Sequence, residues 1–311
     1  MKTVARVTVL FAMVVGVLLG TSSVAQAAYY NEYSDIASTP DSNSCTAAQG
    51  FAAGATYLYV VKTKGDDSRA VIYRVNKSTG KRELMTNGTD KRSYNTWLGH
   101  ANDMTISDID GRHHLFVVTM KSSGAQLVKL RYDGTTYYKV GSYAVKLGGV
   151  TKTVSGISRV SVSSTTLKFF FKSGAAVYNG SIPLRANTGT VNLSKAFDLK
   201  VAGALVNGKT VSDLTTFTNQ GFFYDASTKL LYYPLTKDNR SIVLVYRGIT
   251  AATRGTLTST STLSFRITSS VYSKFEIESV GTSGGRLYFN TNRSNSSGAH
   301  DGVHVFKGYS G

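Results

Sequence analysis

Cysteine is almost absent from this sequence, since Cys45 is the single one in 311 residues. A disulfide within the chain is therefore excluded. The folded state must depend on an ordinary hydrophobic core, which a chain of this length can build. Because no histidine lies near Cys45 in the sequence, we interpret it as a small buried residue and not as a nucleophile.

Long apolar runs are also scarce. The run from Val7 to Leu19 follows Lys2 and Arg6 and precedes the small residues around Ala27. This is the pattern of a secretory signal peptide that is cleaved after Ala27. The run is shorter than the roughly 20 residues of a membrane-spanning helix, and no later run is longer. We therefore expect residues 1–27 to be removed and the mature chain to be secreted, without a transmembrane segment.

Acidic residues are few, with 18 Asp and Glu against 35 Lys and Arg. The formal charge is +17, or +15 without Lys2 and Arg6. Such a surface keeps a secreted protein monomeric and attracts it to polyanions, such as wall teichoic acids, acidic glycans or anionic lipid head groups. The positive residues are spread along the chain, and no motif that reads RNA or DNA is present. An anionic cell surface is therefore favoured as a partner over a specific nucleic acid.

Helix signals are rare as well. Apolar residues hardly ever recur at spacings of three and four, capping boxes are almost absent, and there are only three prolines. Short runs rich in Val, Ile, Tyr, Phe and Thr alternate instead with Gly, Asn, Asp and Ser. This pattern is typical of many strands joined by tight turns, and the chain is predicted to be all-β.

A repeat organises these strands. Each repeat opens with a triplet of a polar, a small and an apolar residue, crosses a turn and continues into an aromatic or β-branched strand. The five repeats begin at Ala47, His100, Thr153, Thr218 and Glu276. A third strand follows in every repeat and a fourth in four of them, as in propeller blades. We predict that residues 28–311 form a single-domain, five-bladed β-propeller, with a β-sandwich or two barrel domains as the alternatives.

The fifth repeat lacks a fourth strand before Gly311. The segment "AYYNEYSDIAS", which starts at Ala28, is strand-like and belongs to no repeat. We expect this N-terminal segment to complete the last blade and to close the ring non-covalently.

The triplets are candidates for a site, because the innermost strands of a propeller line its channel. Their second residue is small except at Asp103, and their third is always apolar. Their first residue is always polar, namely Gln49, Asn102, Ser155, Gln220 and Glu278. Two interpretations stay open and are compatible: the polar residues bond to one another and to free backbone groups, or they line a ligand pocket.

For a ligand pocket we single out His100, Asn102, Asp103, Gln220, Glu276, Glu278 and Gln49. Trp97 and Tyr94 are close enough in sequence to stack on a sugar ring. Packing between blades is the alternative for Trp97.

A glycoside hydrolase is the rival interpretation. Propeller glycosidases need two carboxylates across the scissile bond, commonly with a third acid. Here Asp103 paired with Glu278, or with Glu276, supplies the two catalytic carboxylates, and the third acid is missing.

Other chemistry finds little support in the sequence. The stretch "DIDG" from Asp108 lacks the later ligands of a calcium loop and is interpreted as a hairpin turn. No zinc-ligand spacing, phosphate-binding loop or nucleophile elbow is present. We therefore expect neither a metal nor a cofactor.

The segment "FEIESVGTSGGRLYFNTNRSN", with Glu276 and Glu278, resembles the acidic segment before a late strand in the helveticin-J-like secreted propellers of Gram-positive bacteria. The "LGHANDM" and "QGF" stretches are similar to parts of that family's early and middle blades. The resemblance implies a secreted five-bladed propeller with a bacteriocin-like role at a bacterial surface, without a cofactor.

The predicted function is therefore binding of a cell-envelope or glycan ligand at the channel mouth. An adhesion module recruited by charge alone is a third possibility.

Overall fold

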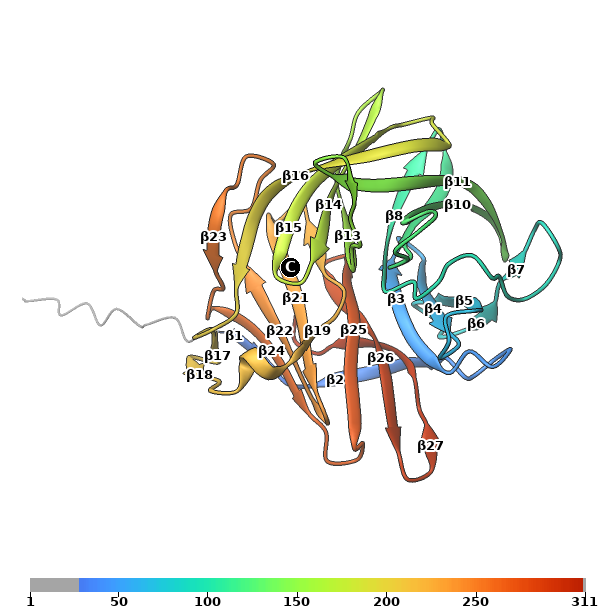
Figure 1. Ribbon diagram of the computed structural model, residues 1–311. Coiled ribbons are helices and arrows are strands. Elements are labelled where there is room, and N and C mark those ends of the chain that lie inside the picture. The colour runs from blue at the N-terminus through green and yellow to red at the C-terminus, as the bar shows by residue number, and fades with distance from the viewer. Residues whose placement is uncertain (1–27, 310–311) are drawn as a thin grey trace, which may run out of the picture.

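The computed structural model describes residues 28–309 (Figure 1). The expected signal peptide, residues 1–27, lies outside this range. Within the described residues the chain is all-β, as predicted, with one 3-10 turn, η1 (Leu214–Thr216). No helix in this part of the chain has the length and apolar character needed to cross a membrane.

Strand pairing groups the strands into five successive antiparallel sets, which we call units one to five. Unit one contains β3 (Ala47–Ala53), β4 (Tyr57–Thr63), β5 (Ala70–Asn76) and β6 (Arg82–Leu84). Unit two contains β8 (Asp103–Ile109), β9 (Arg112–Val118), β10 (Leu127–Asp133) and β11 (Thr136–Leu147). Unit three contains β13 (Gly156–Val162), β14 (Thr166–Ser173), β15 (Ala176–Pro183) and β16 (Thr188–Lys200).

Unit four contains β19 (Thr218–Asn219), β20 (Phe223–Asp225), β21 (Leu230–Lys237), β22 (Arg240–Tyr246) and β24 (Leu263–Thr268). Unit five contains β25 (Lys274–Ser283), β26 (Arg286–Asn295), β28 (Gly302–Phe306) and β2 (Tyr33–Ser38). The remaining strands are β1 (Ala28–Tyr30), β7 (Thr86–Asn87), β12 (Val150–Thr151), β17 (Leu205–Val206), β18 (Lys209–Thr210), β23 (Gly255–Thr258) and β27 (Gly298–Ala299). Parallel pairing of β11 with β16 joins the outer edges of units two and three.

The first strands of the units contact one another in a closed cycle: β3 with β8, β8 with β13, β13 with β20, β20 with β25, and β25 with β3. Figure 1 shows β3, β8, β13 and β25 gathered toward the middle of the molecule. A separate hydrophobic cluster lies between each pair of neighbouring units. Burial of both faces of the sheets explains why their strands are rich in β-branched and aromatic residues.

The N-terminal segment joins two units. As predicted, β2 pairs antiparallel with β28 and completes unit five. The preceding strand β1 differs from the prediction, because it pairs in parallel with β24 of unit four. Tyr30 explains this difference, since its ring stacks on Phe265 with the centroids 4.7 Å apart and meets Tyr309 edge-on. Ring stacking of this kind adds to the stabilisation from buried area.

Ion pairs of a buried lysine also connect the N-terminal segment and unit five to unit one. Lys62 of β4 is fully buried and forms ion pairs with Asp41 at 2.6 Å and with Asp301 at 2.9 Å. Its Nζ also donates to the carbonyl oxygen of Thr39 at 2.9 Å. One ammonium group therefore connects unit one, the segment after β2 and the loop before β28.

Two smaller expectations are confirmed. Cys45 is fully buried and free. The "DIDG" stretch forms the turn between β8 and β9, where Asp110 and Gly111 have φ angles of 51° and 71°. Two successive positive φ angles are typical of a tight hairpin turn.

Candidate functional site

The triplets lie where the innermost strands depart from regular pairing. A register shift in β3 places Gln49 and Gly50 in a bulge, and a shift in β25 leaves Glu278 as the extra residue. Strand β8 begins at Asp103, directly after Asn102, and the inner strand of unit four is interrupted between β19 and β20. Bulges and breaks redirect side chains and free backbone N–H groups from the ladder, so these groups are available at the centre of the ring.

Asp103 occupies this centre and is fully buried. Its Oδ2 accepts hydrogen bonds from the backbone N–H of Ile157 in unit three at 3.0 Å and of Phe222 in unit four at 3.1 Å. Its Oδ1 accepts from the hydroxyl of Ser279 in unit five at 2.8 Å and from the N–H of Met104 at 3.0 Å. One carboxylate thus joins four units.

Lys172 is fully buried and interacts electrostatically with the Asp103 carboxylate. Burial raises the pKa of Asp103 and lowers the pKa of Lys172, while the attraction between the two opposes both shifts. The Nζ of Lys172 donates to Ser155 Oγ at 3.0 Å and to Asn219 Oδ1 at 2.8 Å. Buried groups of opposite charge that are also hydrogen-bonded stabilise each other, whereas either charge alone would be costly to bury.

Glycine at the second position of three triplets makes room for this centre. A Cβ atom added at Gly221 would lie 2.8 Å from Asp103 Oδ1 and 2.8 Å from Ser279 Oγ. A Cβ atom at Gly50 would lie 2.7 Å from the carbonyl oxygen of Ala101. The second position is therefore small because neighbouring units meet there.

We expect Gly221→Ala to lower the free energy of unfolding by about 1–3 kcal/mol, because the added methyl group must displace Asp103 or Ser279. Gly65→Ala is the control, since no atom lies within 4 Å of a Cβ atom at that position. Urea unfolding of both variants measures the difference. Equal stability of the two would contradict close packing at the centre.

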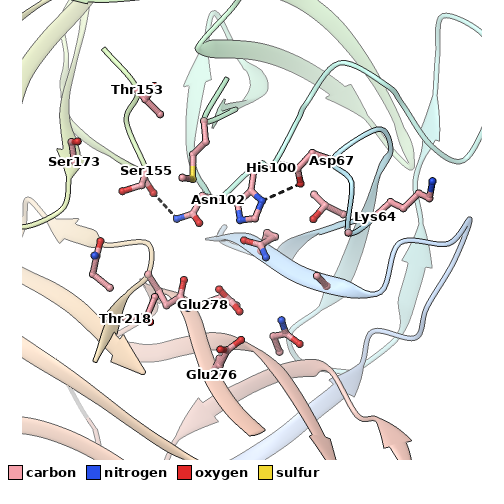
Figure 2. A pocket seen from close by; sticks show the side chains of 18 of the residues that line it. Lys64, Asp67, His100, Asn102, Thr153, Ser155, Ser173, Thr218, Glu276 and Glu278 are labelled. Carbon is pink, nitrogen blue, oxygen red and sulfur yellow. Dashed lines mark hydrogen bonds and ion pairs between the residues drawn. The ribbon is translucent and has the colours of Figure 1, made fainter. Parts of the chain in front are cut away.

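A cavity of about 650 Å³ opens beside this centre (Figure 2). The first residues of all five triplets line it, namely Gln49, Asn102, Ser155, Gln220 and Glu278. The structure thus brings one polar residue from each unit together around this cavity. No Phe, Tyr or Trp is among the described residues that line the cavity, so the lining offers no aromatic ring for stacking.

Two carboxyl groups of unit five lie side by side in this cavity (Figure 2). Glu278 is only 2% exposed. Its pKa is raised well above the usual range, first by burial and then by the neighbouring Glu276, while Lys274 and Asn292 lower it. Glu276 has a counter-ion, because Lys274 Nζ lies 2.9 Å from its Oε2. The two carboxyl groups thus lie in different environments. Such differences are how active sites give two neighbouring carboxyl groups different pKa values.

Gln49 lines the same cavity and carries an unpaired acceptor. Its side chain is 7% exposed, and its Oε1 has no hydrogen-bond partner among the described residues. Buried polar atoms are nearly always paired. The unpaired Oε1 is itself buried, so a donor reaches it only when the Gln49 side chain turns toward the cavity.

Two further predicted residues are held by local contacts. His100 Nδ1 lies 3.0 Å from Asp67 Oδ1, and both residues line the cavity. Asn102 Nδ2 donates to the carbonyl oxygen of Ser155 at 2.7 Å, which joins units two and three. Both interpretations of the triplet residues therefore apply to Asn102. It forms a hydrogen bond between two units, and it also lines the cavity.

Three residues predicted to contact a ligand do not line the cavity. Asp103 lies beneath it, with both oxygens occupied by the hydrogen bonds described above. Trp97 packs edge-on against Tyr137 at a centroid distance of 6.2 Å, in the cluster between units one and two. Tyr94 is covered by Arg69 and Arg92 instead of facing the cavity. Packing, the alternative considered for Trp97, explains its position.

The proposed catalytic pairing of Asp103 with Glu278 or Glu276 loses its geometric basis, because Asp103 cannot face a ligand in this cavity.

Sequence reasoning missed several residues of the lining. Asp67 lies in the loop between β4 and β5, and Lys274 lies two residues before Glu276. Asn292 is the cross-strand partner of Glu276. The strand partner and the i−2 neighbour of Glu276 follow from the strand assignment. Asp67 lies in the connection between the second and third strands of unit one, a place from which Met120 of unit two and Gly174 of unit three also line the cavity.

A second cavity of about 550 Å³ lies at the opposite ends of the inner strands, lined by Gly54, Ile106, Arg159 and Thr282 among others. None of the triplet residues reaches it. Across residues 28–309, no three His, Cys, Asp or Glu side chains are grouped so as to hold a metal ion.

No protein-family model and no curated protein matches the chain. Several solved structures are similar over most of its length. A calcium-binding regucalcin from Agrobacterium tumefaciens is 9% identical, with a TM-score of 0.43, covering 91% of this chain and 96% of its own. The GH43_1 enzyme from Xanthomonas citri complexed with xylose is 8% identical, with a TM-score of 0.49 and coverage of 89% and 90%. RS223 beta-xylosidase is 9% identical, with a TM-score of 0.47 and coverage of 88% and 94%. At such identities, what these proteins bind or act on does not carry over to the present chain.

Proposed function

We propose that this protein is a secreted five-bladed β-propeller, with the five units as its blades, that binds a cell-envelope or glycan polymer in the cavity at one mouth of its channel. The observation that carries this proposal is the convergence of one polar residue from every unit on a single cavity. Concave sites with a few convergent polar groups are the usual binding sites of proteins.

The chemistry of the lining favours a ligand rich in hydroxyl and amine groups. Gln49, Asn102 and Gln220 supply amides, Ser155 a hydroxyl group, and Glu278 a carboxyl group. These groups donate and accept hydrogen bonds in many directions. Without an aromatic platform, recognition depends on hydrogen bonding more than on stacking.

The charge of the chain supports a cell surface as the location. A net charge of +15 for residues 28–311 draws the protein to anionic envelope polymers over distances longer than a hydrogen bond. The resemblance of the Glu276–Glu278 region to helveticin-J-like propellers supports a bacteriocin-like role at a Gram-positive surface. The proposal includes secretion of the chain after cleavage of the signal peptide behind Ala27.

An array of glycans and purified wall polymers tests the proposal with wild type and with Gln220→Ala. Gln220 lines the cavity and makes only a 3.3 Å side-chain hydrogen bond to Thr236, so its loss should not disturb the fold. We expect at least about a fivefold loss of binding, the worth of one hydrogen bond of about 1 kcal/mol. Lys168→Ala, on an exposed position of β14, is the control. Binding that is equal in all three proteins and disappears at high salt would identify a charge-recruited adhesion module instead.

Hydrolysis of a glycan is the second candidate function. The unequal environments of Glu276 and Glu278 favour it, because a buried carboxyl group with a raised pKa can act as a general acid. Incubation with wall polysaccharides should then release reducing ends, and Glu278→Gln should abolish the release. Absence of release from every polymer that binds would leave binding as the function.

A further inference from the structure

One wall of the cavity consists of hydrogen-bond acceptors. Glu276 and Glu278 lie side by side on β25, and they are two of only four glutamates in the chain. Gln49 Oε1, from the bulge of the adjacent strand β3, has no partner among the described residues. We call these three side chains the acceptor wall. Figure 2 shows Glu276 and Glu278 on the same side of the cavity.

We infer that the acceptor wall binds a primary ammonium group carried by the polymer, so that the protein selects amine-bearing over N-acylated ligands. This inference rests on the proposed function, because it specifies the ligand of the same cavity. It adds a chemical class that neither the repeat nor the resemblance implies.

The alternatives fit the acceptor wall less well. An anionic group of the ligand would face two carboxyl groups and would be repelled. A hydroxyl group can donate one hydrogen bond but leaves Glu278 without a counter-ion. An ammonium group has three donors and no acceptor, and hydrogen bonds between ionised groups are about twice as strong as neutral ones.

The local counter-ions leave this position open. Lys274 lines the cavity too, and its Nζ lies 2.9 Å from Glu276 Oε2, so it neutralises Glu276. No salt bridge to Glu278 is formed within the described residues, although Lys274 acts on it at longer range. A buried carboxyl group without its own cation is costly when ionised, and a bound ammonium group would supply the missing charge.

The basic surface acts over long distances, whereas the acceptor wall acts only on a group inside the cavity. The surface charge attracts a polymer that is anionic overall, whereas the acceptor wall is a local site for a positive group on that polymer. Cell-envelope polymers that combine anionic backbones with pendant amines satisfy both requirements. A purely cationic polymer satisfies only the local one.

Two pairs of probes test the inference by calorimetric titration. The first pair is D-alanylated teichoic acid and the same polymer after mild alkaline removal of the alanyl esters. The second pair is chitosan oligosaccharides and the same oligosaccharides after N-acetylation. The two pairs distinguish an ester-linked amino acid from an amino sugar as the source of the ammonium group.

Wild type should bind the amine-bearing member of at least one pair about tenfold or more tightly than its partner. Glu278→Gln keeps the size of the side chain and should weaken that binding about 30-fold, the effect of losing one partner of a buried charged hydrogen bond. Gln49→Ala should weaken it as well. Glu32→Gln is the matched control, because Glu32 is exposed and lies outside the cavity.

Proton uptake or release gives an independent readout. An ammonium group beside Glu278 should release a proton from it, and titrations in buffers of different ionisation enthalpy measure this. The other charged or titratable groups of the lining are Glu276, Lys274, Lys64, Asp67 and His100. Glu278→Gln should remove the release, whereas a signal from His100 or Asp67 would persist.

Three outcomes would overturn the inference. Equal binding within both pairs, with loss in Gln220→Ala, would leave the proposed function standing and would refute ammonium recognition. Unchanged selectivity in a folded Glu278→Gln variant would do the same. Binding that no cavity variant affects would overturn the inference and the proposed function together.

Discussion

Replacing Asp103 with alanine should lower the free energy of unfolding by at least about 3 kcal/mol. The substitution leaves the N–H groups of Ile157, Phe222 and Met104 buried without an acceptor, at about 1–3 kcal/mol for each unsatisfied group. It also removes the charge that offsets buried Lys172. At about 2–4 °C per kcal/mol, the midpoint of thermal unfolding should fall by about 6–12 °C.

The isosteric change Asp103→Asn separates the hydrogen bonds from the packing. One amide oxygen can still accept from Ile157 and Phe222, and the amide NH₂ can donate to Ser279 Oγ. The Met104 N–H loses its acceptor, so we expect an intermediate loss of stability. Asp133→Ala, at an exposed position, is the control and should change stability by less than about 0.5 kcal/mol. A thermal midpoint for Asp103→Ala equal to that of Asp133→Ala would contradict a structural role for Asp103.

The same comparison separates the two interpretations of the triplet residues that the sequence leaves open. If Asp103 is a structural residue, its variants lose stability, and the fraction that remains folded still binds the ligand. If Asp103 contacts the ligand directly, binding is lost at full stability. The hydrogen bonds of both oxygens favour the first result.

The repeat allowed much of the architecture to be predicted. The polar, small and apolar positions of the triplets follow from local geometry, and the structure confirms each class: Phe51 and Ile157 are buried, Gly50 and Gly221 pack closely, and Gln220 lines the cavity. Pairing of β2 with β28 followed from counting strands. Such features depend on alternation and spacing, which a sequence contains directly.

The role of Asp103 could not be predicted, because its partners are distant in the sequence. The donors Ile157, Phe222 and Ser279 lie 54, 119 and 176 residues away. No local pattern distinguishes a carboxylate that faces a ligand from one that accepts backbone N–H groups of other units. Trp97 is a similar case, since stacking on a sugar and packing on Tyr137 require the same residue.

Replacing Lys62 with alanine should have an effect of similar size at the closure of the ring. Lys62 and Asp301 both have fully buried side chains. Removing one partner of a buried ion pair typically costs about 3–5 kcal/mol, because the other charge remains in the interior. Asp41 loses an ion pair too, but its side chain is 44% exposed and can be solvated. We expect a cooperative unfolding transition at lower urea concentration.

The pH dependence of this loss has a definite sign. Burial already raises the pKa of Asp301, and Lys62 lowers it. Without Lys62 the folded-state pKa rises further above the unfolded value. Such a group contributes stability below its unfolded pKa and loses that contribution as the pH rises through its folded pKa. The difference between wild type and Lys62→Ala should therefore be largest near pH 7 and should shrink toward pH 4.

A double substitution tests whether the cost arises from the unpaired charge. Lys62→Met keeps the apolar stem and leaves Asp301 unpaired, so it should resemble Lys62→Ala at pH 7. Adding Asp301→Asn removes the second charge and should recover a large part of the loss, as when buried ion pairs are replaced as a unit. Lys200→Ala, on an exposed position at the end of β16, is the control. If the double variant is no more stable than Lys62→Met alone, loss of the contacts with Thr39 and Asp41 dominates. The N-terminal segment would then be held to unit one by those contacts and not by the buried pair.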